Sequence, residues 1–199
     1  MHADEARDYL FRFFGYGDPS SPLWFVGIEE GGEPDKPLQA DGHSSLALGG
    51  DALFYDPKLP EWESGDRKPL WSKYRDISQR AGNGTGYFMS NMAPLARPSV
   101  THPLHGVSWP AYRQRVIQER IPMLRGLLAE FRPKAVLIHG ASAWRTYMVR
   151  EAFDLPALTG RIQSHPDRGL IFTNFLLRGF PNTDRDAVVG ILRQWLGTR

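Results

Sequence analysis

The chain has 199 residues, of which 41% are hydrophobic, and a formal net charge of +2. This length and composition favour one soluble globular domain, and no apolar run approaches the ~20 residues that a membrane span needs. The sequence contains no cysteine, which excludes disulfides, thiolate zinc sites and Cys-ligated iron–sulfur clusters.

The charges are distributed unevenly along the chain. Residues 1–66 carry 14 acidic and 4 basic side chains, a net charge of −10, whereas residues 67–199 carry 8 acidic and 20 basic ones, a net charge of +12. Arginine provides 19 of the 24 basic residues. Since Arg binds phosphate with two parallel hydrogen bonds, this pattern is typical of a nucleic-acid binder. A GC-rich genome, however, also favours Arg over Lys.

The opening MHADEAR lacks the form of a secretory signal, so we expect a cytoplasmic location.

Hydrophobic periodicity predicts helices that alternate with four strands. A helix is expected at about residues 3–14, and YGDPSSP is expected to form a turn. The expected strands are 23–28, 87–91, 134–140 and 169–176, and the later helices are 69–81, 110–131, 142–153 and 183–196. Ser108 is expected to cap the second of these helices, and Pro122 to kink or divide it.

This alternation is typical of a single three-layer α/β/α domain over residues 1–199, with a four-stranded, mostly parallel central sheet. Residues 31–66 are rich in Gly, Pro, Ser and Asp and show no sustained period. We therefore expect a long irregular insertion there, of the kind that is usually functional or mobile.

Polar residues stand at the end of each predicted strand. In a parallel sheet the carboxyl ends of the strands meet at one edge, where ligands bind. That edge is expected to carry Glu29 and Glu30, then Asn91, then His139 with Gly140, and finally Arg178, Phe180 and Asn182. Four such positions in one place predict a functional site.

The same segments resemble the uracil-DNA glycosylase superfamily, nearest to its single-strand-selective monofunctional and mismatch-specific branches. The motifs are GIEEGG (27–32), FMSNMAPLARP (88–98) and VLIHGASAW (136–144), followed by a loop after the fourth strand. As a pattern of elements the resemblance spans residues 20–195. Its best match is Asn-x-x-Pro-Leu, which begins at Asn91.

The resemblance implies a monofunctional DNA glycosylase that works without a metal or another cofactor and acts in base excision repair. Glu29 matches the position that places or activates the attacking water. The side chains of neighbouring residues on an extended chain point in opposite directions. We therefore assign the catalytic role to Glu29 and expect Glu30 to be a supporting or surface residue. Asn91 matches the residue that reads the Watson–Crick edge of the flipped base. Its amide carries both a donor and an acceptor.

Further residues fit a nucleic-acid site by their chemistry. Phe54 is a candidate for stacking on the base, and Phe180 for the wedge that fills the space left by a flipped nucleotide. Phosphate contacts are expected from Arg97, Ser99 and His102, and from the backbone at Ser142, where a helix begins. The expected partner is DNA, single-stranded or mismatched, or a nucleotide. No membrane partner is expected, and the default state is a monomer.

The chain departs from the family in its third motif, His-Pro-Ser, which should follow the fourth strand. That place reads LRGFPNTD, and SHP occurs instead at Ser164–Pro166, ahead of the strand. Arg178 is the candidate that replaces the missing histidine as the cation stabilising the leaving base, and it is equally a candidate for binding a phosphate of the flipped nucleotide. The main candidates also have ordinary interpretations: Glu29 and Glu30 as a surface-loop pair without a role, Arg178 as a solvent-facing side chain, Asn91 as a turn residue, and Phe180 or His139 as a core residue.

Two other functions remain open on the sequence. One is a glycosylase-fold module that binds DNA or a nucleotide without cutting it. The other is a metal-dependent phosphoesterase that uses Glu29, Glu30, Asp35 and His43, although these residues lack any standard ligand spacing.

Overall fold

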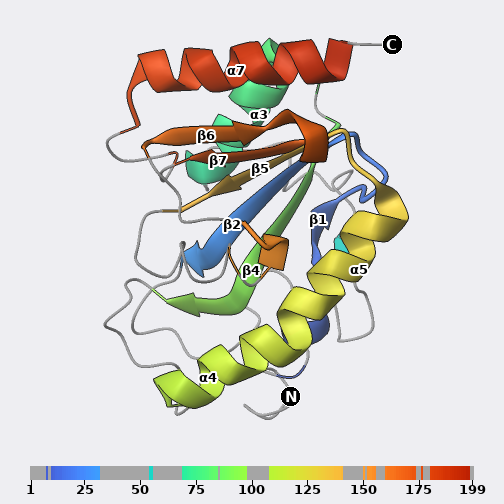
Figure 1. Ribbon diagram of the computed structural model, residues 1–199, viewed down its shortest axis with the longest axis vertical. Helices are drawn as coiled ribbons and strands as arrows, with labels where there is room; N and C mark the ends of the chain where they lie inside the picture. Colours follow the sequence, from blue (N-terminus) through green and yellow to red (C-terminus); the bar gives the residue numbers. More distant parts are fainter. Residues whose placement is uncertain are drawn as a thin grey trace.

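A computed structural model describes residues 8, 10–31, 54–55, 69–84, 86–97, 108–140, 150, 152–155, 160–173, 176 and 180–197, and of residues 29–31, 54–55, 69, 95–97 and 109 it describes only the backbone. These residues form a mixed sheet with helices packed against it (Figure 1). The strands are β1 (Gly15–Gly17), β2 (Leu23–Gly31), β3 (Phe54–Tyr55), β4 (Phe88–Arg97), β5 (Ala135–His139), β6 (Ile162–His165) and β7 (Leu170–Thr173). The helices are α3 (Pro69–Arg80), α4 (Trp109–Arg115), the π-helical turn η3 (Val116–Arg120), α5 (Ile121–Phe131), the 3-10 turn η4 (Pro166–Arg168) and α7 (Asn182–Gly197).

The sheet has the strand order β3-β1-β4-β2-β5-β7-β6. Its four central strands are parallel to one another and correspond to the four strands predicted from the sequence. The prediction of a four-stranded sheet is nevertheless wrong, because β1, β3 and β6 extend the sheet to seven strands. Both β1 and β6 pair antiparallel with their inner neighbours.

The three missed strands are short and carry weak sequence signals. Gly15–Gly17 overlaps the start of the predicted turn YGDPSSP (16–22), and Phe54–Tyr55 is a two-residue strand inside the predicted irregular insertion. The edge strand Ile162–His165 is polar and only partly buried. Strand propensity and alternation become visible only over several residues, so strands of two to four residues escape detection.

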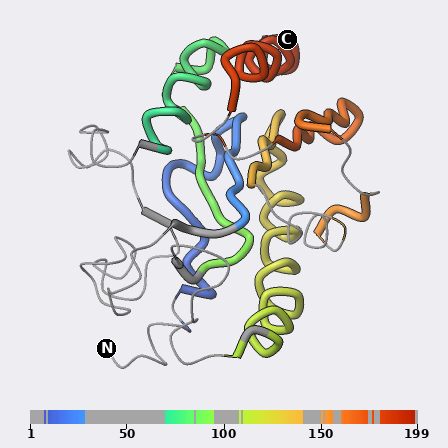
Figure 2. The backbone as a smooth tube through the Cα atoms, turned by 90° about the vertical axis from the view of Figure 1, so that its left-hand side faces the viewer, coloured from blue at the N-terminus to red at the C-terminus, as the bar shows by residue number. Residues whose placement is uncertain are grey.

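The core lies on both faces of the central strands. Trp24 and Phe25, adjacent in β2, are both 0% exposed. Trp24 contacts Phe131 at the end of α5, while Phe25 stacks on Tyr74 of α3. Helices therefore cover both faces, as Figure 2 shows for the α4–α5 segment on one side of the strands and α3 on the other.

The helical segment 109–131 follows the sequence prediction closely. Ser108 occupies the N-cap position, although its side chain makes no capping hydrogen bond, and the segment ends at Phe131. It is divided by the π-helical turn Val116–Arg120, which ends two residues before Pro122. Proline lacks the N–H that the carbonyl four residues earlier needs, and its ring crowds that carbonyl. A wider turn at this point relieves both problems.

Strands β2 and β4 are longer than predicted, which changes the setting of two candidate site residues. β2 continues through Glu29 and Glu30 to Gly31, and β4 continues from Asn91 through Pro94 to Arg97. The sequence analysis ended both strands early because carboxylates and proline usually mark strand ends. Here the two strands pair with each other beyond the rest of the sheet. Pro94 is tolerated because the pairing of β4 with β1 stops at Ser90.

Two further observations complete the fold. The first helix was expected to reach residue 14, but its described part ends at Arg12. No helix in the described part of the chain is long and apolar enough to cross a membrane.

Candidate functional site

Four of the central strands meet in one row near their carboxyl ends. Asn91 of β4 is in register with Gly27 of β2, Gly27 with His139 of β5, and His139 with Thr173 of β7. His139 and Thr173 are the last residues of their strands. Asn91 and His139 therefore share one row of the sheet, but the prediction that both stand at strand ends holds only for His139. Asn91 lies within its strand rather than at its end.

Beyond this row, β2 and β4 continue as a two-stranded extension. Glu29 pairs with Ala93, and the register then shifts before Gly31 pairs with Arg97. Glu29 thus belongs to the extension, two residues past the row that contains His139. The structure places its backbone there but does not describe its side chain.

The strand order gives β2 a special position in the sheet. After β2 the chain forms β4 on one side of it and later β5 on its other side. The junction between β2 and β5 is therefore the point where the direction of winding reverses, and open α/β sheets bind ligands outside the carboxyl ends of the strands at such a point. Glu29 lies in the extension of one of these two strands, and Gly140 directly follows the other.

Gly140 allows the chain to leave β5 close to β2. Its φ is +150°, and a Cβ added there would collide with the side chain of Ile28. Glycine is therefore needed for a close approach of the backbone at the junction.

His139 is part of the core at this edge. Its side chain is 2% exposed, and its Nε2 shares a hydrogen bond with the hydroxyl of Tyr74, whose ring stacks on Phe25 at 4.4 Å between centroids. Burial lowers the pKa of His139 to about 3, and burial also raises the pKa of Tyr74. Both groups are therefore neutral at physiological pH. This agrees with the interpretation of His139 as a core residue.

Asn91 is partly buried, and its backbone carbonyl is bound by a side chain from the α4–α5 segment. Its carbonyl oxygen accepts hydrogen bonds from Nε and Nη2 of Arg120, at 3.1 and 2.9 Å. The site therefore has a buried cation next to the residue that was expected to recognise a base.

The remaining predicted site residues have different outcomes. Phe180 is 6% exposed and belongs to the hydrophobic core. A wedge that enters DNA must be exposed, so Phe180 is a core residue in this structure. Arg178, Ser99, His102 and Ser142 lie outside the described residues, as do the side chains of Glu29, Phe54 and Arg97. The backbone of Phe54 lies in β3, where it pairs with Gly15.

The histidine of the SHP sequence lies far from this edge. His165 ends β6 and pairs with Leu170, the first residue of β7. It therefore lies at the amino end of β7, as the sequence analysis expected.

Two residues that the sequence analysis did not select contribute to the site, namely Tyr74 and Arg120. Tyr74 lies in the helix predicted at residues 69–81, and nothing in that prediction pointed to a contact with His139. Arg120 carries a clearer signal, since Tyr112, Val116, Arg120 and Leu124 recur at intervals of four and are all buried. A charged residue in the buried stripe of a helix indicates a specific partner.

A metal centre finds no support in the described part of the chain. No three His, Cys, Asp or Glu residues there come together as metal ligands. Asp35 and His43 of the phosphoesterase hypothesis lie outside the described residues.

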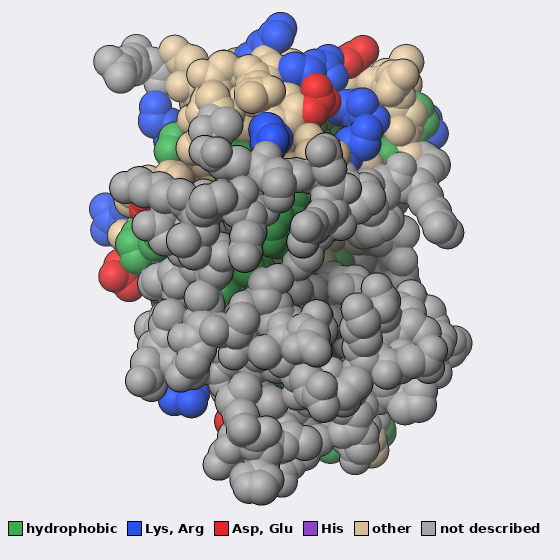
Figure 3. Space-filling view, turned by 180° about the vertical axis from the view of Figure 1, so that it is seen from behind, with side chains coloured by type: hydrophobic (Ala, Val, Ile, Leu, Met, Phe, Trp, Pro, Cys, Tyr) green, Lys and Arg blue, Asp and Glu red, His purple; other side chains and the backbone are tan. Residues whose placement is uncertain are grey.

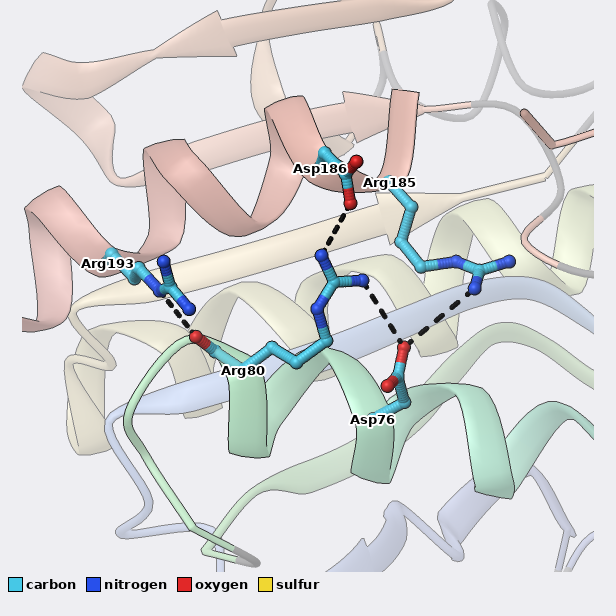
Figure 4. A network of polar contacts seen from close by, with 5 residues as sticks. All are labelled: Asp76, Arg80, Arg185, Asp186 and Arg193. Atoms are coloured by element: carbon cyan, nitrogen blue, oxygen red, sulfur yellow. Dashed lines mark hydrogen bonds and ion pairs between the residues drawn. The ribbon is translucent and has the colours of Figure 1, made fainter. Parts of the chain in front are cut away.

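Many basic residues at one end of the molecule are engaged in contacts within the chain. Seen from behind, Lys and Arg side chains gather at the top, interspersed with acidic ones (Figure 3). Figure 4 shows their network: Arg80 contacts Asp76 and Asp186, Arg185 contacts Asp76, and Arg193 donates to the carbonyl of Arg80. These contacts join α3 to α7. They assign a structural role to arginines that the charge pattern alone attributed to nucleic-acid binding.

A cavity of about 300 Å³ lies elsewhere, at the amino ends of β5 and β7. Its lining includes Val136 and Leu170 together with Arg125 and Arg168. These two arginines donate to the carbonyls of Ala152 and Phe153. The cavity is therefore separate from the edge that carries Asn91.

A comparison of the sequence with models of known protein families gives no match, and a comparison with curated proteins gives none either.

Proposed function

We propose that the protein is a DNA glycosylase-like hydrolase, which cleaves the N-glycosidic bond of a flipped uracil-type or modified base. The observation that carries the proposal is the position of β2 at the reversal point of the sheet. Glu29 follows the row of Asn91, Gly27 and His139 by two residues along this strand. This geometry supports a ligand that contacts Asn91 and Glu29 together. The motif resemblance supports a base in DNA as that ligand.

The proposed reaction needs three groups. The amide of Asn91 donates to and accepts from the edge of the extruded base. Glu29 holds the attacking water and offers a negative charge opposite the oxocarbenium-like sugar. A positive charge or a donor must then stabilise the departing base.

His139 does not supply that positive charge. It is buried and its pKa is about 3, so the imidazole is neutral under working conditions. In the proposed mechanism Arg178 takes this role. Arg97, Ser99, His102 and Ser142 provide the phosphate contacts, and Phe54 stacks on the base.

A base-release assay tests the proposal. Labelled oligonucleotides with uracil, 5-hydroxymethyluracil, hypoxanthine or xanthine are offered as single strands and as mismatched duplexes, with the wild type and Glu29→Gln. The proposal predicts abasic sites with at least one base, and their absence with the variant. No release from any of these substrates would contradict it.

The neutral state of His139 also favours a second candidate, a glycosylase-fold module that binds DNA or a nucleotide without cutting it. Such a module needs no charge to stabilise a leaving base. It predicts salt-dependent DNA binding without base release, and Glu29→Gln leaves that binding unchanged.

A further inference from the structure

Arg120 is a buried cation within the hydrophobic core. Its side chain is 2% exposed and lies on the inner stripe of the α4–α5 segment, between Val116 and Leu124. Charged side chains are almost never buried to this degree without specific partners. Its partners therefore indicate what the residue does.

The partners of Arg120 are main-chain carbonyls from two segments. Nη1 donates to Phe13 at 2.6 Å and to Phe11 at 3.2 Å, and Nη2 donates to Phe14 at 3.2 Å. Phe11 belongs to the described part of the first helix, which ends at Arg12, and Phe13 and Phe14 come directly after it. Nε and Nη2 donate to Asn91 on the other side. Arg120 thus ties the end of the first helix to the middle of β4.

The contact with Asn91 replaces a missing strand contact. The pairing of β1 with β4 ends at Gly15 and Ser90, one residue before Asn91. Beyond this point the carbonyl of Asn91 receives two guanidinium N–H groups instead. Ser90 closes the arrangement, because its Oγ lies 3.5 Å from Nη2 and donates to the carbonyl of Phe14 at 2.6 Å.

Arg120 lies at an irregular point of its helix. The residue ends the π-helical turn that precedes Pro122. Such turns are rare and occur frequently at functional sites. The irregular turn thus coincides with the buried cation.

We propose that Arg120 is a positioning residue for Asn91. By fixing the peptide of Asn91 from behind β4, it sets where the Asn91 amide stands at the sheet edge and so governs how well the base is recognised. The proposal rests on the function proposed above. It assigns a role to a residue on the opposite face of the sheet from Tyr74.

The first part of the test does not depend on activity. The side-chain amide of Asn91 is followed by ¹⁵N NMR, and its signal is assigned by its loss in Asn91→Ala. Arg120→Lys keeps the charge but loses the planar set of donors, so the amide should lose order, seen as a lower ¹⁵N order parameter. Arg125→Lys is the matched control, because Arg125 lies one turn further on and donates to Ala152 instead. An unchanged amide in Arg120→Lys overturns the proposal.

The second part is a double-mutant cycle on base release. Arg120→Lys should lower kcat/KM about tenfold or more in the wild-type background, since small displacements of a positioning group cost about that much. It should have no further effect when Asn91 is already alanine. Equal losses in both backgrounds would indicate a purely structural role and would overturn the proposal.

The outcomes separate the two proposals. A disordered amide together with no base release by the wild type means that Arg120 positions Asn91 but that the glycosylase function is wrong. If Arg120→Lys does not fold, Ser90→Ala provides the same cycle, because it removes the hydroxyl between Arg120 and Phe14. Ser90→Ala should lower kcat/KM about threefold. An unchanged kcat/KM together with an unchanged Asn91 amide signal in this variant would overturn the proposal.

Discussion

Burial of His139 predicts a measurable dependence of stability on pH. The pKa of His139 is lowered to about 3 in the folded protein by burial, whereas an unfolded histidine titrates near 6.5. Between these values the unfolded chain binds a proton at His139 that the folded chain does not. The contribution of neutral His139 to the free energy of unfolding is therefore fully present above about pH 6.5 and is lost as the pH falls toward 3.

The size of the effect follows from these two pKa values. From pH 7 to pH 5 the free energy of unfolding should fall by about 2 kcal/mol through His139 alone. Urea unfolding of the wild type and His139→Gln at both pH values measures it, because titration of all other groups is common to the two proteins. Tyr74→Phe is the control. It should keep the full pH dependence, since burial rather than the Tyr74 hydroxyl lowers the pKa.

Equal pH dependence of the wild type and His139→Gln would refute this reasoning. If His139→Gln does not fold, the ring of His139 can be titrated directly by NMR in the wild type. Its resonances should stay constant between pH 8 and pH 5. A midpoint near 6.5 would contradict the account.

Three further predictions concern other parts of the structure. In urea unfolding, Gly169→Ala should destabilise the protein by at least ~1 kcal/mol more than Gly82→Ala does. Both glycines have a positive φ, which costs alanine ~1–2 kcal/mol at either site. Of the two, only Gly169 would place its Cβ against a carbonyl oxygen, that of Lys134 at 2.6 Å. Equal losses would contradict this. Ser78→Ala should stabilise the protein by ~1 kcal/mol in the same measurement, because the buried Oγ of Ser78 has no hydrogen-bond partner among the described residues; a clear loss of stability would show that the hydroxyl is bonded. Base release should persist at full rate in EDTA, and a metal-dependent reaction would instead stop.

The sequence predicted the central sheet well because its strands are buried on both faces. Residues such as Trp24, Phe25 and Leu137 are almost inaccessible to solvent, and uninterrupted apolar runs indicate such strands. The predicted ends of β2 and β4 were wrong for a physical reason. Glutamate and proline are uncommon inside strands, but here the two strands pair with each other past Glu29 and Pro94.

The site was predictable in position but not in detail. The row of Asn91 and His139 followed from the convergence of parallel strands. The contact of His139 with Tyr74, 65 residues away in sequence, depends on how α3 packs and leaves no local signal. Arg120 was detectable by its spacing in the helix, although its carbonyl partners at residues 11–14 were not.

The most direct test of the central claim compares Glu29→Gln with Glu30→Gln. Single-turnover base release and DNA affinity are measured for both variants on the best substrate of the wild type. The account predicts that Glu29→Gln abolishes release while DNA binding persists, and that Glu30→Gln retains most of the rate. If Glu29→Gln releases the base as fast as the wild type, Glu29 does not act on the water and the proposed mechanism is wrong.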